Sequence, residues 1–407
     1  MYITEQHIIK KTNKQWKDLD YLCFLSKNVY NQTLYQVRQH YFKTKEYLTY
    51  PKVNKLFLKE ELESYRKLPA KVSQGSQKLV DREFKSFFAL LKLKQKGEYD
   101  KPVSIPQYAD KIKGRKPVIY QKQALSFVRK GYIKLSKTKI YIKTNKTKEE
   151  VKEVRIVPKN GYVIIEIVCK TIEHAEKQDN QRYASIDLGL NNLVAITSNV
   201  FKPYIINGKP LKSINQYYNK LIAKEKSKLE KTLGRKISNK INKIHLKSKN
   251  KKEDYLHKSS AYIVNHLVTN NINTLIIGYN QGWKQDINIG KVNNQNFVQI
   301  PYARLINMLE YKCRRKGIQV ILHEESYTSK SSFIDNEEIK KHETYLGKRI
   351  KRGLFRTSRG ILINADINAS YNIMKKTLQA KEVWNLNLFR DCIEVCSTPN
   401  IITIGFN

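Results

Sequence analysis

Residues 183–197 read YASIDLGLNNLVAIT, and this stretch decides the fold of the 407-residue chain. Two apolar runs, 183–186 and 193–197, flank a turn and have the pattern of two antiparallel strands. The first run ends on Asp187, and Gly189 allows a tight turn that exposes this carboxylate. The sequence leaves two roles open for Asp187: a ligand or catalytic group at a strand end, or an ordinary turn residue.

Outward from this stretch, helices and strands alternate. The expected elements after it are a long helical region at 211–267, a strand at 274–278, a helix at 301–316, a strand at 318–323 and a helix at 365–376. Strand, reverse turn, strand, helices, strand, helix, strand, helix is the order of elements in an RNase H-like fold. We therefore predict an α/β domain of this class over 181–376.

Further carboxylates stand at the ends of these predicted elements. Glu324 and Glu325 follow the strand 318–323, and Asp366 opens the last helix. In an RNase H-like fold such positions converge, and their oxygens hold two Mg²⁺ ions about 4 Å apart that clamp a phosphodiester. Taken separately, Asp366 would be a helix N-cap and the two glutamates solvated charges. Together with Asp187 they predict a two-metal site.

Charge indicates the partner. Lys and Arg number 77 against 36 Asp and Glu, a net charge of +41, while 40% hydrophobic residues supply a sizeable core. So much positive charge opposes compaction unless a polyanion is bound. A protein that follows a long phosphate backbone needs such a charge, and an enzyme for small acidic substrates does not. We therefore expect a nucleic-acid partner.

Composition excludes other classes. No apolar run reaches the roughly 18 residues of a membrane span, and the first residues lack the apolar core of a secretion signal. The sequence therefore predicts no membrane partner. The five cysteines are scattered, which does not make a disulfide framework and fits a reducing cytosol.

The first half of the chain contains candidate nucleic-acid contacts. Residues 16–97 are mostly helical, and Gln74, Ser76 and Gln77 there are candidates for reading base edges. Short alternating strands over 98–175 predict a small β-barrel domain. In it, four cations lie near Tyr120, which either stacks on a base or packs in the sheet. The cations, Lys111, Lys113, Arg115 and Lys116, are predicted to contact phosphates.

Motifs along most of the chain resemble the TnpB family of transposon-associated, RNA-guided nucleases, related to compact type V CRISPR effectors. The matching stretches are SKNVYNQTL (26–34), KPVSIPQYADK (101–111), VIYQKQALSF (118–127), SIDLGLNNLVAIT (185–197), GYNQGWKQ (278–285), NNQNFVQIP (293–301), EESYTSKSS (324–332) and NADINASYNI (364–373).

The resemblance implies a RuvC nuclease domain of the RNase H-like class, beside a helical recognition domain and a wedge-like β domain. Its parts map as follows: 1–15 and 98–175 wedge-like domain, 16–97 recognition domain, 181–376 nuclease domain with a helical hairpin at 211–267 and an insertion at 326–365, and 377–407 a tail. It implies a guide RNA from the transposon end, double-stranded target DNA with a short adjacent motif, Mg²⁺, and a bacterial cytoplasmic protein that joins the nucleoid when bound.

Two departures from the family pattern concern the site. The family's glutamate usually ends the strand that here ends on Gly278, so the acid moves one strand later, to Glu325 or to Glu324. Two alternatives remain: an inactive site in a guide-directed repressor, or a transposase that joins DNA ends.

The insertion also lacks the family's zinc-binding cysteines, and His342 alone cannot hold zinc, so we predict no structural zinc. Cys392 and Cys396 are expected to be buried hydrophobes.

Overall fold

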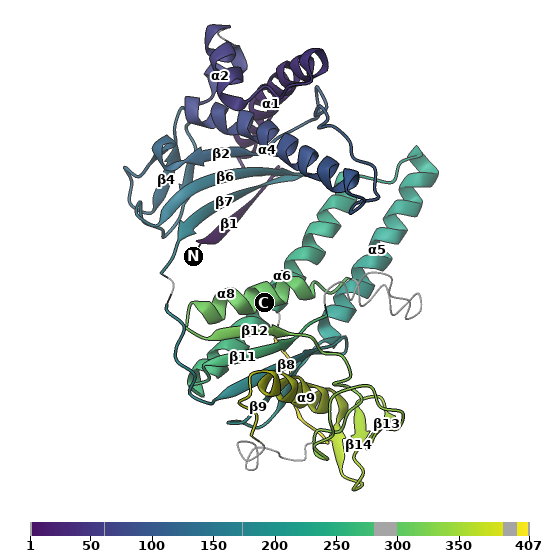
Figure 1. The fold of residues 1–407 in the computed structure, drawn as a ribbon. Helices are drawn as coiled ribbons and strands as arrows, with labels where there is room; N and C mark the ends of the chain where they lie inside the picture. Colours follow the sequence, from purple (N-terminus) through teal and green to yellow (C-terminus); the bar gives the residue numbers. More distant parts are fainter. Residues whose placement is uncertain (1, 61, 173, 281–298, 386–396, 406–407) are drawn as a thin grey trace. The chain divides into compact units, whose positions relative to one another are not determined.

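A computed structural model describes residues 2–60, 62–172, 174–280, 299–385 and 397–405 (Figure 1). Contacts divide the chain into two units, Met1–Ile172 and Glu173–Asn407. Cys392, Cys396 and most of GYNQGWKQ and NNQNFVQIP lie outside the described residues. In the described part of the chain, no helix combines the length and apolarity that a membrane crossing requires.

The first unit combines helices with two antiparallel sheets. Its helices are α1 (Trp16–Thr44), α2 (Tyr50–Lys59), α3 (Glu63–Lys67), α4 (Ala70–Gln95) and the short η1 (Lys122–Ala124). Its strands are β1 (Tyr2–Lys10), β2 (Val118–Gln121), β3 (Leu125–Ser126), β4 (Tyr132–Leu135), β5 (Tyr141–Lys143), β6 (Val151–Lys159) and β7 (Tyr162–Lys170). They pair in the orders β1-β7-β6-β2 and β3-β4-β5. No pairing in the described residues joins β1 to β2, so the expected barrel is not confirmed.

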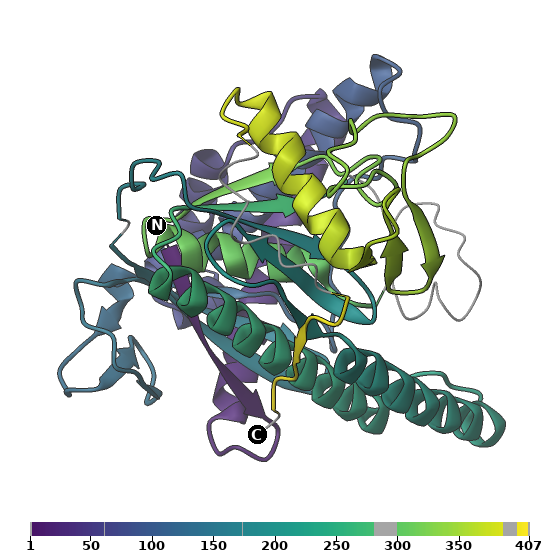
Figure 2. The same cartoon turned by 90° about the horizontal axis from the view of Figure 1, so that it is seen from below.

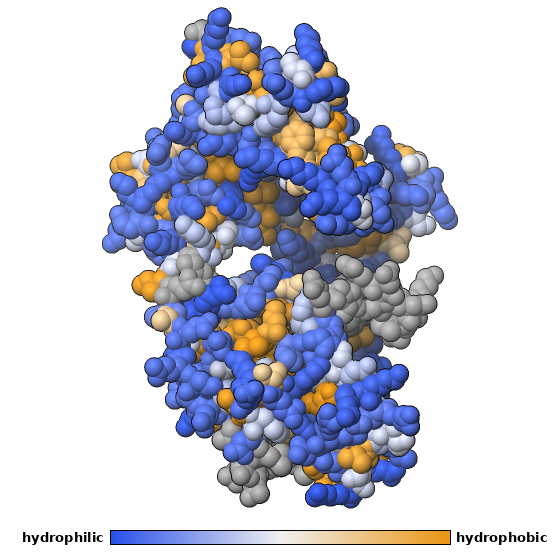
Figure 3. All heavy atoms as spheres, in the orientation of Figure 1, coloured by the Kyte–Doolittle hydropathy of each residue, from blue (hydrophilic) through white to orange (hydrophobic). Residues whose placement is uncertain are grey.

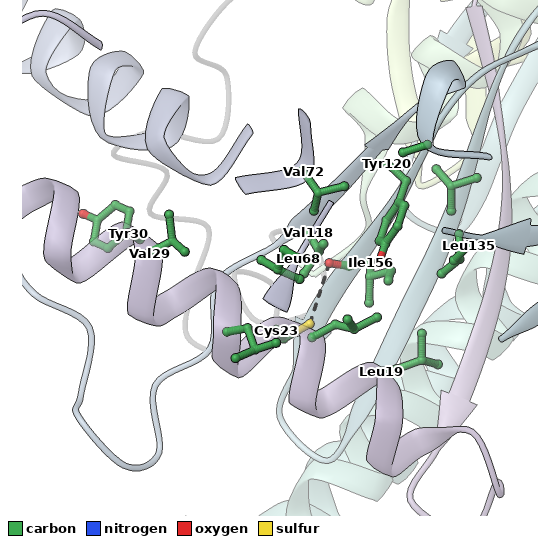
Figure 4. Close-up of a cluster of buried hydrophobic side chains, with 14 of the residues drawn as sticks. Leu19, Cys23, Val29, Tyr30, Leu68, Val72, Val118, Tyr120, Leu135 and Ile156 are labelled. Atoms are coloured by element: carbon green, nitrogen blue, oxygen red, sulfur yellow. Dashed lines mark hydrogen bonds between the residues drawn. The ribbon is translucent and has the colours of Figure 1, made fainter. Parts of the chain in front are cut away.

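One apolar core joins the helices of this unit to its larger sheet. Figure 4 shows Cys23 of α1 among buried side chains from α4, β2 and β6. The Cys23 thiol donates to the carbonyl of Ile156 over 3.9 Å, and burial raises its pKa far above the usual range. Cys23 is therefore an inert packing residue.

The second unit is built around a six-stranded mixed sheet. Its strands are β8 (Tyr183–Leu188), β9 (Asn192–Ser198), β10 (Tyr204–Asn207), β11 (Thr274–Gly278), β12 (Gln319–His323) and β16 (Asn400–Ile402), in the order β12-β11-β8-β9-β10-β16. Strands β8, β9 and β10 run antiparallel, whereas β11 and then β12 run parallel to β8. The mixed α/β class that the sequence predicts is confirmed.

Helices cover both faces of this sheet (Figures 1 and 2). They are α5 (Lys209–Leu233), α6 (Asn239–Thr269), α8 (Tyr302–Arg314) and α9 (Ala365–Ala380). Because side chains of a strand alternate, Ala184 and Ile186 enter the core beneath α6 and α8, while Tyr183 packs with α9. By the same alternation Ser185 and Asp187 lie on the side of α9, which we call the α9 face.

The insertion between β12 and α9 packs on the helix through Phe333, Phe355 and Ile363 and also contains buried hydrogen bonds. It contains a small antiparallel sheet of β13 (Lys348–Lys351), β14 (Leu354–Arg356) and β15 (Leu362–Asn364). The buried carboxylate of Glu337 accepts backbone bonds from Ser332 (2.6 Å) and Leu346 (2.8 Å). The buried Lys375 of α9 donates to the Glu337 carbonyl over 2.8 Å. Hydrogen bonds therefore tie the insertion to α9.

Candidate active site

Asp187 lies near the end of β8 on the α9 face, partly buried. Burial raises the pKa of its carboxyl well above the usual range, and the nearby carboxylates of Asp366 and Glu325 raise it further. Arg349 opposes this shift. Carboxylates add to such a shift only when they stand close by, so the contributions of Asp366 and Glu325 place them near Asp187. The three acids predicted from separate segments of the sequence thus share one neighbourhood.

Asp366 sits in the first turn of α9 but does not cap the helix. That role belongs to Asn364, whose side-chain oxygen accepts from the backbone N–H groups of Asp366 (3.0 Å) and Ile367 (3.3 Å). The N-cap interpretation of Asp366 is therefore wrong. Its carboxylate instead accepts from Asn192 Nδ2 over 2.6 Å and lies 3.6 Å from the guanidinium of Arg349.

The carboxylate of Glu325 occupies the space that a side chain on Gly278 would fill. A Cβ built on Gly278 would stand 2.6 Å from Glu325 Oε2 and 2.5 Å from Ile373 Cδ1 of α9. Ile277 of β11 pairs with Ile186 of β8, so the next position, Gly278, comes level with Asp187. Glu325 thus delivers its carboxylate beside Asp187 although its backbone belongs to the segment after β12.

Asn280 hydrogen-bonds to the backbone N–H of Glu325 and to one of its two carboxylate oxygens. The backbone N–H of Glu325 donates to Asn280 Oδ1 (3.2 Å), and Asn280 Nδ2 donates to Glu325 Oε1 (3.3 Å). The other oxygen, Oε2, is buried without a hydrogen-bond partner among the described residues. Burial, helped by Glu324, raises the pKa of Glu325 to about 7. An unpartnered buried carboxylate oxygen is a free coordination position or a proton site.

Glu324 has the opposite environment. It is exposed, pairs with Lys376 of α9 at 2.6 Å and accepts from the backbone of Ser326 at 2.9 Å. Although burial opposes the effect, hydrogen bonds from Lys376 and Ser326 keep its pKa below the usual value. Of the two glutamates left open by the sequence, the geometry therefore favours Glu325 as the third member of the site.

The donor set suits a hard divalent cation. The available ligands are carboxylate oxygens, with the amides of Asn192 and Asn280 beside them, which is the chemistry that Mg²⁺ prefers. The unpartnered Glu325 oxygen fits the same role. Within the residues that the structure describes, no three Asp, Glu, His or Cys side chains already converge on one point as metal ligands. The acids are neighbours that a cation would still have to draw together.

Comparisons with known proteins match the chain over both halves of the second unit. A family model described as OrfB_IS605, probable transposase, matches residues 166–284, and one described as Cas12f1-like, TNB domain, matches 302–373. The TnpB-like protein ORF457 of Acidianus two-tailed virus is 23% identical over 413 residues, which cover 89% of this chain and 84% of that protein. These matches support a protein of the TnpB family.

The chain is also similar to Cas12f proteins. The CRISPR-associated endodeoxyribonuclease Cas12f2 of a Micrarchaeota archaeon (strain CG1_02_47_40) is 31% identical over 221 residues, or 51% of this chain and 40% of that protein. Solved structures of a Cas12f1–sgRNA–target DNA complex and of a CRISPR-Cas12f ternary complex each give a TM-score of 0.37. Their identities are 16% and 15%, they cover 92% and 88% of this chain, and the chain covers 100% and 82% of theirs.

The predicted phosphate contacts of this TnpB-family chain divide into two pairs. The side chains of Lys111 and Lys113 are exposed. Arg115 instead forms two hydrogen bonds to Asp20, at 2.8 and 3.0 Å. Lys116 pairs with Glu83 at 3.0 Å and lies over the Tyr30 ring at 3.6 Å. Arg115 and Lys116 are therefore engaged within the unit, and Lys111 and Lys113 are free to meet a phosphate.

Burial excludes three other predicted contacts from the surface. Tyr120 and Gln77 are fully buried, and Ser76 is 2% exposed with its hydroxyl bonded to Ser26. Tyr120 packs in the sheet, as the alternative interpretation held, so it stacks on no base, and Ser76 and Gln77 read no base edge. Gln74 is partly exposed and remains a candidate. A helical face rich in Ser and Gln looked polar in the sequence, but α1 covers it.

Sequence reasoning missed the residues that orient the acids. Asn192, Asn280 and Asn364 each bond to a site carboxylate or to the backbone beside it. Arg349 was one of many cations in the insertion, and only the fold brings it to Asp366. The sequence does not show which carboxylate an Asn at a turn or at the start of a helix will contact.

Proposed function

We propose that this TnpB-family protein is an RNA-guided DNA endonuclease whose second unit is a RuvC domain of the RNase H-like class. The order β12-β11-β8-β9-β10, with β8 to β10 antiparallel and β11 and β12 parallel to β8, supports that class. The observation that carries the proposal is the position of Glu325, whose carboxylate stands where a Gly278 side chain would, beside Asp187. An acid absent from β11 is thus replaced from the next strand.

In this proposal Asp187, Glu325 and Asp366 hold two Mg²⁺ ions. Such ions lower the pKa of a bound water and neutralise charge on the phosphodiester. The chain's own groups prepare the site: Asn192 fixes one Asp366 oxygen, and Asn280 fixes one Glu325 oxygen. The guanidinium of Arg349, about half exposed, offers a positive charge toward the incoming phosphate.

The proposed partners are a guide RNA from the transposon end and double-stranded DNA with a short adjacent motif. Base pairing reads the sequence, so the protein needs mainly a cationic surface that follows the backbone. The net charge of +41 supports this, as do the exposed Lys111 and Lys113. The similar protein Cas12f2 is a CRISPR-associated endodeoxyribonuclease, which supports DNA as the substrate. The hydrogen-bonded insertion supports a fold without structural zinc.

The test is cleavage by the protein purified with the RNA that it retains. Sequencing this RNA defines the guide, and a library of matched duplexes defines the adjacent motif. Asp187→Ala should lower the cleavage rate about a thousandfold, because a metal ligand is lost. The Kd for target DNA should stay within about twofold, because no Lys or Arg that neutralises the nucleic-acid backbone is removed. Glu324→Ala is the control and should cut like the wild type. Wild-type cleavage by Asp187→Ala contradicts the assignment.

A guide-directed DNA-binding protein without cleavage is the second candidate. The missing carboxylate at the end of β11 and the absence of a converged ligand set in the described residues favour it. It predicts tight, salt-sensitive target binding with no cut product at any Mg²⁺ or Mn²⁺ concentration. The same wild-type assay therefore separates the two functions, and a retained RNA is expected for both.

A further inference from the structure

Three hydroxyl groups meet between the sheet and α9 beneath the acidic site. Ser185 of β8, Thr197 of β9 and Ser370 of α9 are each fully buried. Their oxygens lie 2.8 Å (Ser185–Thr197), 2.9 Å (Thr197–Ser370) and 3.1 Å (Ser185–Ser370) apart. We call this group the hydroxyl ring. Burying a polar cluster in an apolar core costs free energy unless each group finds a hydrogen-bond partner, whereas Ala and Val would pack there without partners.

Every hydroxyl hydrogen of the ring has an acceptor. Ser185 donates to the carbonyl of Ser370 over 2.5 Å, and Ser370 donates to the carbonyl of Ser185 over 3.0 Å. The Thr197 hydrogen is then left for one of the two serine oxygens. The reciprocal pair ties the backbone of β8 to the backbone of α9 in one register, which apolar packing alone does not fix.

The ring and the carboxylates occupy successive levels of the same two elements. Ser185 precedes Asp187 by two residues on β8, about 6.6 Å along the strand and on the same face. Ser370 follows Asp366 by four residues on α9, about 6 Å along the helix and on the same side. Because these two spacings agree, fixing Ser185 against Ser370 sets Asp366 level with Asp187.

We propose that the hydroxyl ring is a positioning device that holds Asp366 level with Asp187, so that a cation can draw the two carboxylates together. The inference rests on the proposed two-metal function and adds residues that touch neither metal nor substrate. A loss of the ring lets α9 slide or roll against β8, which separates the two carboxylates without unfolding the unit. Groups that orient ligands from behind typically change metal affinity by 10- to 100-fold.

Thr197 offers a matched pair of variants. Thr197→Val removes the hydroxyl and keeps the shape, whereas Thr197→Ser keeps the hydroxyl and loses a methyl group. Thr377→Val is the control on α9, since Thr377 is 2% exposed and its hydroxyl donates only to the carbonyl of Ile373, within the helix. Ser370→Ala repeats the test from α9 and replaces Thr197→Val if that variant does not fold.

Three measurements separate positioning from general stability: Mn²⁺ affinity by calorimetry, the Mg²⁺ concentration for half-maximal cleavage, and amide exchange of peptides covering 364–372. We expect Thr197→Val to weaken Mn²⁺ binding about tenfold, to raise the Mg²⁺ requirement by a similar factor and to speed exchange at 364–372. Thr197→Ser and Thr377→Val should match the wild type, and target binding should be unchanged in all variants.

The possible results distinguish the two proposals. Wild-type Mn²⁺ affinity and Mg²⁺ requirement in both Thr197→Val and Ser370→Ala overturn the positioning role. If the wild type neither binds Mn²⁺ nor cuts, the two-metal function fails, and exchange at 364–372 then decides the ring alone: an unchanged rate in Thr197→Val refutes it. Equal losses in Thr197→Val and Thr377→Val also refute it, because they report stability rather than register.

Discussion

Charged side chains that were predicted to be functional have opposite electrostatic environments in the two units. In the first unit Arg115 and Lys116, which look like nucleic-acid contacts in the sequence, already have carboxylate partners in Asp20 and Glu83. In the second unit Asp187 and Glu325 lie among like charges, and both have raised pKa values. A charged side chain that already has an oppositely charged partner belongs to the scaffold. Like charges that the fold holds close together despite their repulsion mark a functional site. Figure 3 shows hydrophilic residues over most of the drawn face of both units, so a hydrophilic surface alone does not distinguish the two cases.

The largest effect on cleavage in this comparison is expected at Gly278 of β11, beside the carboxylate of Glu325. In Gly278→Ala the new methyl group would stand 2.6 Å from Glu325 Oε2, so the carboxylate must move. We expect about a hundredfold loss of cleavage at unchanged target affinity, as a displacement of roughly 1 Å typically causes. Cleavage rates and gel-shift titrations measure the two quantities.

A swap and a control sharpen this prediction. Gly278→Glu combined with Glu325→Gly returns the acid to β11 and should recover part of the cleavage that Gly278→Glu alone loses. Gly75→Ala is the control, because a Cβ there meets only ordinary contacts at 3.7 Å and beyond. Full cleavage by Gly278→Ala would show that the space beside Asp187 is not used.

The next effect is a dependence on pH that originates in Glu325. Its folded-state pKa of about 7, against the usual 4.5, means that the folded protein holds a proton that the unfolded chain releases between these values. The free energy of unfolding without metal should therefore fall by on the order of 2 kcal/mol as the pH rises from 4.5 to 7. Mn²⁺ affinity should rise over the same range, because the cation displaces that proton.

Glu325→Gln isolates this contribution. Urea titrations at several pH values should give a flatter profile in this variant than in the wild type, and calorimetry should show less proton release on Mn²⁺ binding. Identical pH profiles for the two proteins would mean that Glu325 is not the group that holds the proton.

The sequence predicted the elements around the acids well and their surroundings poorly. Strand 274–278 is confirmed as β11, and helices expected at 211–267 and 365–376 appear as α5, α6 and α9. The insertion at 326–365 contains β13 to β15, which the sequence did not predict because strands of three or four residues are too short to show an apolar alternation. The sequence does not show which acid fills the space beside Gly278 or which groups orient it. Both depend on the register between segments that are far apart in the chain.

A smaller effect is expected from the paired cations of the first unit. Arg115 and Asp20 are about one quarter exposed and joined by two hydrogen bonds, so Arg115→Ala leaves a half-buried carboxylate alone. We expect a loss of about 1 kcal/mol of stability, read from urea unfolding of the full chain, without a change in the salt dependence of RNA binding. A lowered salt slope with unchanged stability would reassign Arg115 as a phosphate contact.

The smallest effect belongs to the exposed pair Lys111 and Lys113. Because neither side chain has an ion-pair partner among the described residues, Lys111→Ala/Lys113→Ala should leave the free energy of unfolding unchanged. Each lost phosphate contact lowers the slope of log K against log salt for single-stranded RNA by roughly 0.7, so the double variant should lose about 1.4. Lys116→Met is the control: it removes a paired cation, and it should lower stability while it leaves the slope intact. A full slope in the double variant would place the guide RNA on another surface and leave these lysines as solvated charges.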